Sequence, residues 1–231
     1  MASGVPLDNS RRIAVAAFAA AGAGVVGLAG VQLCLRPGLP FDGVDLAQRA
    51  QYLERHGRCW FWGWMLAGIG ALLVVNLYRV LAARWEGTCA GKCRMAMILA
   101  TAGMGADFAG IALWMLVAPG LDAAGLSLVE KMAAALSLFV AKILYASAGV
   151  LLTLAGRREF PRPLFILSFG VWLAGLAVAI ATARAAGSAQ IWSLAALVVL
   201  FIAWSSLLGF HFLGLEAGRA GVAVFHPDPR D

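Results

Sequence analysis

Two side chains of opposite charge lie deep inside apolar stretches of this sequence, where an unpaired charge is costly. Asp107 lies 12 residues after Met95, and Lys142 lies 13 residues before Ala155. If these stretches cross a membrane in opposite directions, a rise of 1.5 Å per residue places both charges about 18–20 Å from the same membrane face. We therefore expect an ion pair between them, with Tyr145 as a third, hydrogen-bonding member.

This intramembrane polar site has two interpretations. In the first, the pair is structural and fixes the register of two neighbouring helices. In the second, it belongs to a pathway, because ionisable groups inside membranes often mark proton or solute routes. Small residues beside the aspartate, namely Gly103, Ala106 and Gly110, favour the close approach of a partner helix in either case.

Four cysteines form two groups along the chain. Cys34 and Cys59 lie at the ends of consecutive apolar segments, on the outer, oxidising side of the membrane, where a disulfide between them is permitted. The sequence alone does not establish the distance that the bond requires. Cys89 and Cys93 fall on the opposite side and should be reduced. They begin the pattern C-x3-C-x-M-x-M with Met95 and Met97, and soft sulfur ligands of this kind suit Cu(I). No other cofactor is expected.

The composition identifies the elements that must hold these side chains. Of the 231 residues, 62% are hydrophobic and 13% are charged, and the mean hydropathy is +0.85. A soluble domain carries about 25% charged residues, so a soluble enzyme, a disordered chain and a disulfide-stapled secreted domain are excluded. Six segments are long enough to cross a bilayer as helices: Ile13–Cys34, Cys59–Ala82, Met95–Ala118, Met132–Ala155, Leu164–Ala183 and Ile191–Gly214.

The sequence therefore predicts an all-α, polytopic membrane protein: one transmembrane domain over residues 1–231, folded as a six-helix bundle. Eleven of the 18 Lys and Arg residues fall in one set of connections and six in the other. The positive-inside rule then places both termini in the cytoplasm. A composition rich in Ala, Gly and Arg is typical of a GC-rich bacterium, so we expect the bacterial cytoplasmic (inner) membrane. The basic charge faces lipid headgroups and requires no nucleic acid.

The longest connection, Asp45–Arg58, has apolar residues at helical spacing. It predicts a short amphipathic helix on the outer surface, with Asp42 or Asp45 as its N-cap, while Glu54 and His56 face solvent. Tryptophans gather near the ends of several segments. We interpret these residues as aromatic belts at the membrane interfaces, and their positions are Trp60, Trp62, Trp64, Trp85, Trp114 and Trp192.

No catalytic motif is present: the sequence contains neither G-x-S-x-G nor H-E-x-x-H, and no P-loop. We therefore favour a non-catalytic membrane protein that acts as a structural, assembly or binding subunit, with the lipid bilayer and other membrane subunits or copies of itself as partners. The first alternative is a small proton-coupled transporter or channel that uses Asp107 and Lys142. The second is a copper or thiol-redox protein that uses the Cys89–Met97 sulfurs.

Overall fold

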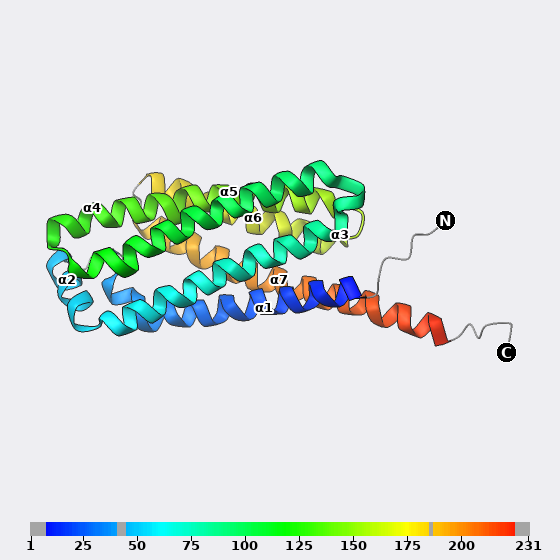
Figure 1. Ribbon diagram of the computed structural model, residues 1–231, viewed down its shortest axis with the longest axis horizontal. Coiled ribbons are helices and arrows are strands. Elements are labelled where there is room, and N and C mark those ends of the chain that lie inside the picture. Colours follow the sequence, from blue (N-terminus) through cyan, green and yellow to red (C-terminus); the bar gives the residue numbers. More distant parts are fainter. Residues whose placement is uncertain (1–7, 41–44, 185–186, 225–231) are drawn as a thin grey trace.

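Helix is the only regular secondary structure in the part of the chain that the computed structural model describes, residues 8–40, 45–184 and 187–224. The prediction of an all-α chain is therefore confirmed. Figure 1 shows the helices running side by side as an elongated bundle. The α-helices are α1 (Asp8–Gly30), α2 (Leu46–Arg55), α3 (Gly57–Ala112), α4 (Ala123–Ala134), α5 (Ala141–Ala155), α6 (Arg162–Ala183) and α7 (Gly187–Val224).

Short π-helical and 3-10 segments extend several of these helices. The π-helical segment η1 (Val31–Leu35) and the 3-10 turn η2 (Arg36–Gly38) continue α1. In the same way η3 (Leu113–Val117) and η4 (Ala118–Gly120) continue α3. The π-helical segment η5 (Ala135–Val140) joins α4 to α5 without a break. Both 3-10 turns carry a proline near their start, which explains why each helix ends there.

Five helices among the described residues are long and apolar enough to cross a membrane, which agrees with a membrane protein. The sequence predicted six separate segments, and the difference lies in α3. Two of the predicted segments, Cys59–Ala82 and Met95–Ala118, fall within the single candidate span Gly57–Gly120. The residues between them contain no proline, and their backbone departs from helical geometry at Cys89. The five helices are Asn9–Gly38, Gly57–Gly120, Ala124–Ala155, Arg162–Ala183 and Ala189–Ala217.

Helix α3 nevertheless folds back on itself at one residue. Cys89 has non-helical backbone angles, with φ of −140° and ψ of 43°. We call residues 57–88 the first arm of α3 and residues 90–112 its second arm. The arms lie antiparallel, because Trp60 near the start of the first arm donates a hydrogen bond from Nε1 to the Trp114 carbonyl oxygen, 2.6 Å away. Figure 1 shows the reversal at the same end of the bundle as the start of α1.

The bundle core is built largely from small and aromatic residues. Helix α3 packs against α1 and α5, and α7 packs against α1 and α6.

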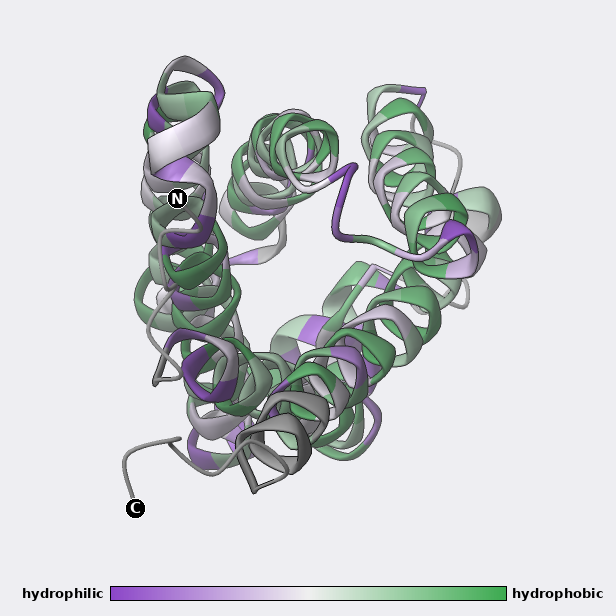
Figure 2. Cartoon of the chain, turned by 90° about the vertical axis from the view of Figure 1, so that its right-hand side faces the viewer, coloured by the Kyte–Doolittle hydropathy of each residue, from purple (hydrophilic) through white to green (hydrophobic). Residues whose placement is uncertain are grey.

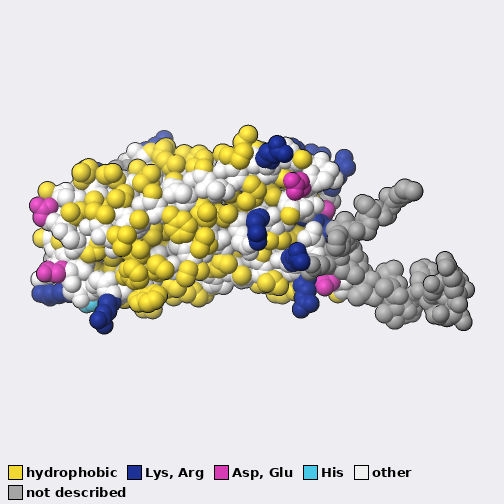
Figure 3. Space-filling model, in the orientation of Figure 1, with side chains coloured by type: hydrophobic (Ala, Val, Ile, Leu, Met, Phe, Trp, Pro, Cys, Tyr) yellow, Lys and Arg dark blue, Asp and Glu magenta, His cyan; other side chains and the backbone are white. Residues whose placement is uncertain are grey.

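Hydrophobic residues occur along every long helix in Figure 2. On the face shown in Figure 3, hydrophobic side chains cover the middle of the molecule, whereas Lys and Arg gather mainly toward the end where α3 reverses. An apolar girdle with charged ends is the surface that a bilayer requires.

The tryptophans correct one prediction from the sequence. Trp62 and Trp192 are exposed on the surface, as residues of an aromatic belt would be. Trp60 is completely buried, however, and Trp85 and Trp114 are 3% exposed. The rings of Trp60, Trp64 and Trp114 form a cluster with centroids 5.7 Å apart in each pair. These side chains therefore pack helices together instead of lining a membrane interface.

Candidate functional site

The charged pair predicted from the sequence lies between the second arm of α3 and α5. Lys142 Nζ is 3.4 Å from Asp107 Oδ2. The lysine side chain is 18% exposed and the aspartate side chain 11%, so both are largely removed from the surface of the bundle. Lys142 is the second residue of α5, directly after the π-helical segment η5. Segments of π-helix often occur at functional positions, because they re-aim the side chains that follow them.

Tyr145 lies beside this pair but interacts differently from the prediction. Lys142 Nζ is 5.5 Å from the centroid of the Tyr145 ring, which is the geometry of a cation–π contact. The buried Tyr145 hydroxyl has no hydrogen-bond partner among the described residues, so the expected hydrogen bond to the pair is not formed. The carbonyl oxygen of Tyr145 accepts a hydrogen bond from the Tyr78 hydroxyl at 3.2 Å, which ties α5 to the first arm of α3.

Small residues let the two backbones approach closely at this site. A Cβ atom at Gly110 would collide with Ser137 Oγ and lie 2.9 Å from the carbonyl oxygen of Ala133. A Cβ atom at Gly103 would lie 3.2 Å from Leu144. Ser137 also donates a hydrogen bond to the carbonyl oxygen of Asp107 at 3.4 Å. The predicted small-residue face of α3 therefore faces η5 and α5, and Ser137 adds a polar contact that the sequence analysis missed.

A second buried ion pair was also missed. Arg49 of α2 binds Glu130 of α4 through Nη1 and Oε1, and both side chains are buried. Arg49 lies three residues after Leu46 and four before Leu53, so it shares the inner face of α2 with them. That spacing was the available signal, but the sequence analysis did not use it. The pair attaches α2 to α4 at one end of the bundle.

The short helix α2 lies between α1 and α3, within the connection where the sequence predicted one. Asp45 is its N-cap residue but makes no capping hydrogen bond through its side chain, and Asp42 lies outside the described residues. Glu54 and His56 are exposed, as expected of solvent-facing residues. The His56 ring stacks on Tyr52 with centroids 4.5 Å apart.

A disulfide joins the two helices on either side of α2. Cys34, near the end of the first membrane helix, is bonded to Cys59, near the start of α3, with Cα atoms 5.1 Å apart. The Tyr52 hydroxyl donates a hydrogen bond to the carbonyl oxygen of Cys34 at 3.0 Å. A tyrosine hydroxyl is protonated at neutral pH, and partial burial raises the pKa of Tyr52 further.

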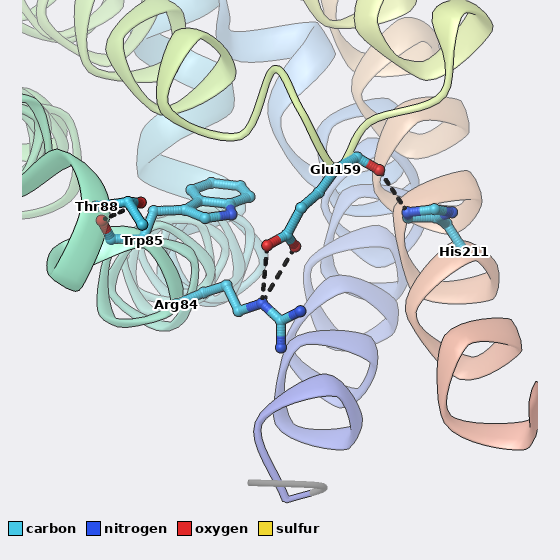
Figure 4. A network of polar contacts seen from close by, with 5 residues as sticks. All are labelled: Arg84, Trp85, Thr88, Glu159 and His211. Atoms are coloured by element: carbon cyan, nitrogen blue, oxygen red, sulfur yellow. Dashed lines mark hydrogen bonds and ion pairs between the residues drawn. The ribbon is translucent and has the colours of Figure 1, made fainter. Parts of the chain in front are cut away.

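At the opposite end of the bundle, a polar network joins three parts of the chain (Figure 4). Arg84 Nε of the first α3 arm lies 3.1 Å from Glu159 Oε2, in the connection between α5 and α6. His211 Nε2 of α7 donates to the Glu159 carbonyl oxygen at 3.1 Å. The guanidinium of Arg84 also lies over the Phe212 ring, 5.8 Å from its centroid. Glu159 therefore connects α3 with α7.

The four sulfur residues predicted as Cu(I) ligands do not all share one face of α3. Cys89 is the non-helical residue at which α3 reverses. Cys93 is buried, whereas Met95 is half exposed, because residues two positions apart point to different sides of a helix. Cys93 and Met97 do share one face and line a groove together. Among the described residues, no group of three or more His, Cys, Asp or Glu side chains is placed to hold a metal ion.

Comparison with known proteins identifies no relative of this chain. The chain matches no known protein family, no curated protein and no solved structure. Its function must therefore be argued from the contacts themselves. Within residues 8–40, 45–184 and 187–224, three buried or half-buried ion pairs each connect two different parts of the bundle: Asp107–Lys142, Arg49–Glu130 and Arg84–Glu159.

Proposed function

We propose that this protein is a non-catalytic component of the bacterial cytoplasmic membrane, and that it acts as a structural or binding subunit of a membrane complex. The proposal includes six crossings, with both termini in the cytoplasm and α2 on the outer surface. It rests mainly on one observation: the charged side chains inside the bundle pair with one another across helices. Charges that are paired in this way hold helices in place.

The length of α3 supports the six crossings. Its 56 residues would extend about 84 Å as one straight helix, whereas a bilayer core is about 30 Å thick. The reversal at Cys89 divides this length into two antiparallel arms, each long enough for one crossing. In Figure 1 the start of α1, the reversal of α3 and the end of α7 lie at one end of the bundle, which agrees with both termini on the same side.

The outer surface offers apolar helix faces to lipid or to another subunit. Large apolar side chains face outward from several helices, and they include Val15, Ile98, Leu116, Ile166 and Leu207. Lipid tails cover such a surface in a monomer, and apolar helices of another subunit cover it equally well. A rigid bundle with internally paired charges is a suitable framework for that kind of association.

Purification of the tagged protein in native membrane particles, followed by mass spectrometry, tests this function. We expect a second membrane protein, or a second copy of this chain, in stoichiometric amount. The matched control is the same procedure on cells that express the untagged chain, which identifies proteins retained without the tag. A particle that contains one copy of this chain with lipid alone would contradict the proposed subunit role.

A proton-coupled carrier is the second candidate, and the Tyr145 hydroxyl is the observation that favours it. This buried hydroxyl has no hydrogen-bond partner in the described part of the chain, and it lies on the residue whose ring contacts Lys142. Such a group can accept or pass a proton when the neighbouring pair rearranges. Proton flux into liposomes that contain the wild-type protein, lost in Asp107→Asn and retained in the exposed control Glu54→Gln, would support the carrier. Equal flux through wild type, Asp107→Asn and empty liposomes would exclude it.

A further inference from the structure

An open groove lies between the two arms of α3, close to their reversal at Cys89. Its volume is about 760 Å³, which is within the range of small-molecule sites. Most of its wall is apolar, and Ile98, Met97 and Ala102 contribute to it. Two arginines, Arg79 and Arg94, also line it. The groove therefore offers an apolar wall and two guanidinium groups to a single ligand.

The position of the groove along α3 places it in the headgroup layer of a bilayer. A helix that enters the bilayer core near Gly57 crosses about 30 Å within about 20 residues, and therefore leaves the core at about residue 77. Arg79 lies just beyond that level. Counted back from Gly120 by the same rule, the second arm leaves the core at about residue 100, next to Thr101. The groove thus begins where the hydrocarbon core ends.

The charges around the groove give it a net charge of about +1. Arg79 donates from Nη2 to Asn76 Oδ1 at 3.0 Å, which orients its guanidinium without neutralising it. Arg94 is exposed on the second arm, and Glu86 on the first arm adds one negative charge. The neighbouring Arg84 does not line the groove, because it binds Glu159 on another side of the arm.

We infer that this groove binds an anionic phospholipid. Its phosphodiester lies between Arg79 and Arg94, and one acyl chain lies along the apolar wall that contains Met97 and Ile98. The charge of a monoanionic headgroup matches the net charge of the groove, and guanidinium groups are well suited to bind phosphate oxygens. The inference goes beyond the proposed function and does not depend on any partner subunit.

Native mass spectrometry of the purified full-length protein tests this inference. The probes are phosphatidylglycerol, phosphatidylcholine and inorganic phosphate, each added at the same concentration. We expect one retained phosphatidylglycerol per chain, weaker retention of phosphatidylcholine, and no effect of inorganic phosphate on either. Equal retention of the two lipids by the wild-type protein would overturn the inference, and so would displacement of phosphatidylglycerol by inorganic phosphate.

Substitutions locate the bound lipid. Each arginine near a membrane surface contributes about a fivefold gain in affinity for anionic lipid, so Arg79→Gln with Arg94→Gln should weaken phosphatidylglycerol binding roughly 25-fold. The matched control is Arg157→Gln with Arg158→Gln, which removes the same charge from exposed positions outside the groove. Equal weakening in the two double variants would show diffuse attraction to the surface and would overturn the inference.

Two further variants keep the test independent of the arginines. Ala102→Trp fills the groove without changing its charge and should displace the lipid; unchanged binding would contradict the inference. Glu86→Gln removes the only carboxylate that lines the groove and should strengthen phosphatidylglycerol binding. A loss of binding in Glu86→Gln would indicate that the carboxylate recognises a cationic headgroup, and would overturn the assignment of an anionic lipid.

Discussion

Lys142 Nζ lies 3.4 Å from Asp107 Oδ2, although the two residues are 35 positions apart and belong to different helices. Both side chains are largely buried, so each charge depends on the other for its stabilisation. The contact exists because the chain turns between η4 and α4, so that the second arm of α3 packs against α5 in the opposite direction. In a structural subunit this pair would fix the register of the two helices, and in a carrier it would serve as a proton site.

Removal of one partner of this pair should destabilise the bundle. We expect Asp107→Asn and Lys142→Met each to lower the free energy of unfolding by about 3 kcal/mol, because each leaves a single charge in an apolar helix bundle. The double variant should lose less than the sum of the two, which a double-mutant cycle in detergent measures. Glu54→Gln, on an exposed position of α2, is the control. Additive losses would mean that the two residues do not interact.

The buried pair between α2 and α4 gives a second prediction. Glu130→Gln should lower the free energy of unfolding by about 3 kcal/mol, because Arg49 then remains buried without its counter-charge. Replacement of both residues, Arg49→Met with Glu130→Leu, should restore most of that stability. Arg55→Met provides a matched control on the exposed part of the same helix. A double variant that is less stable than Glu130→Gln alone would contradict this prediction. It would mean that the ion pair stabilises the fold more than apolar side chains at the same two positions.

The close approach of α3 to η5 predicts contrasting effects of two glycine substitutions in the same arm. A Cβ atom at Gly110 would collide with Ser137, so Gly110→Ala should cost about 1–3 kcal/mol in unfolding experiments. At Gly105 no atom lies within 4 Å of the added Cβ, so Gly105→Ala should be neutral or stabilise the helix by up to about 1 kcal/mol. Equal losses at the two positions would contradict the packing described here.

The cysteines give a chemical prediction. Without reductant, an alkylating reagent should modify at most two of the four cysteines in the denatured protein, since Cys34 and Cys59 form a disulfide. After reduction it should modify all four. The disulfide closes a loop of 25 residues, so Cys34→Ser with Cys59→Ser should lower the free energy of unfolding by about 3 kcal/mol. Four modified cysteines in the unreduced protein would show that the bond is absent.

The juxtaposition of Asp107 and Lys142 could be predicted from the sequence because it depends only on helical rise and on the ends of two apolar segments. The partner of Arg49 could not, because α2 contacts Glu130 through the packing of elements that are 81 positions apart. The tryptophans were misplaced for a related reason. Trp60 and Trp114 occupy positions near segment ends, where an interface residue and a buried residue have the same local sequence. Whether Trp60 and Trp114 are buried depends on how the second arm of α3 packs against the first arm.

The helical form of the reversal in α3 also lacked a clear signal. Proline residues mark the ends of other helices in this chain, but the stretch around Cys89 contains none. The charged residues Arg84, Glu86, Lys92 and Arg94 indicated a connection outside the membrane, and the structure places a helical reversal there instead of a loop. A turn made by one non-helical residue leaves almost no trace in hydropathy or composition.

The side of the membrane on which each end of α3 lies tests the central claim of six crossings most directly. The measurement uses a chain in which Cys89 and Cys93 are replaced by serine, and a membrane-impermeant maleimide as the label. Single cysteines are introduced at two exposed positions, as Glu54→Cys in α2 and Gly87→Cys next to the reversal. We predict that Glu54→Cys reacts only in right-side-out spheroplasts and Gly87→Cys only in inverted vesicles. Reaction of both positions from the same side would contradict the two crossings of α3, and with them the six-helix account.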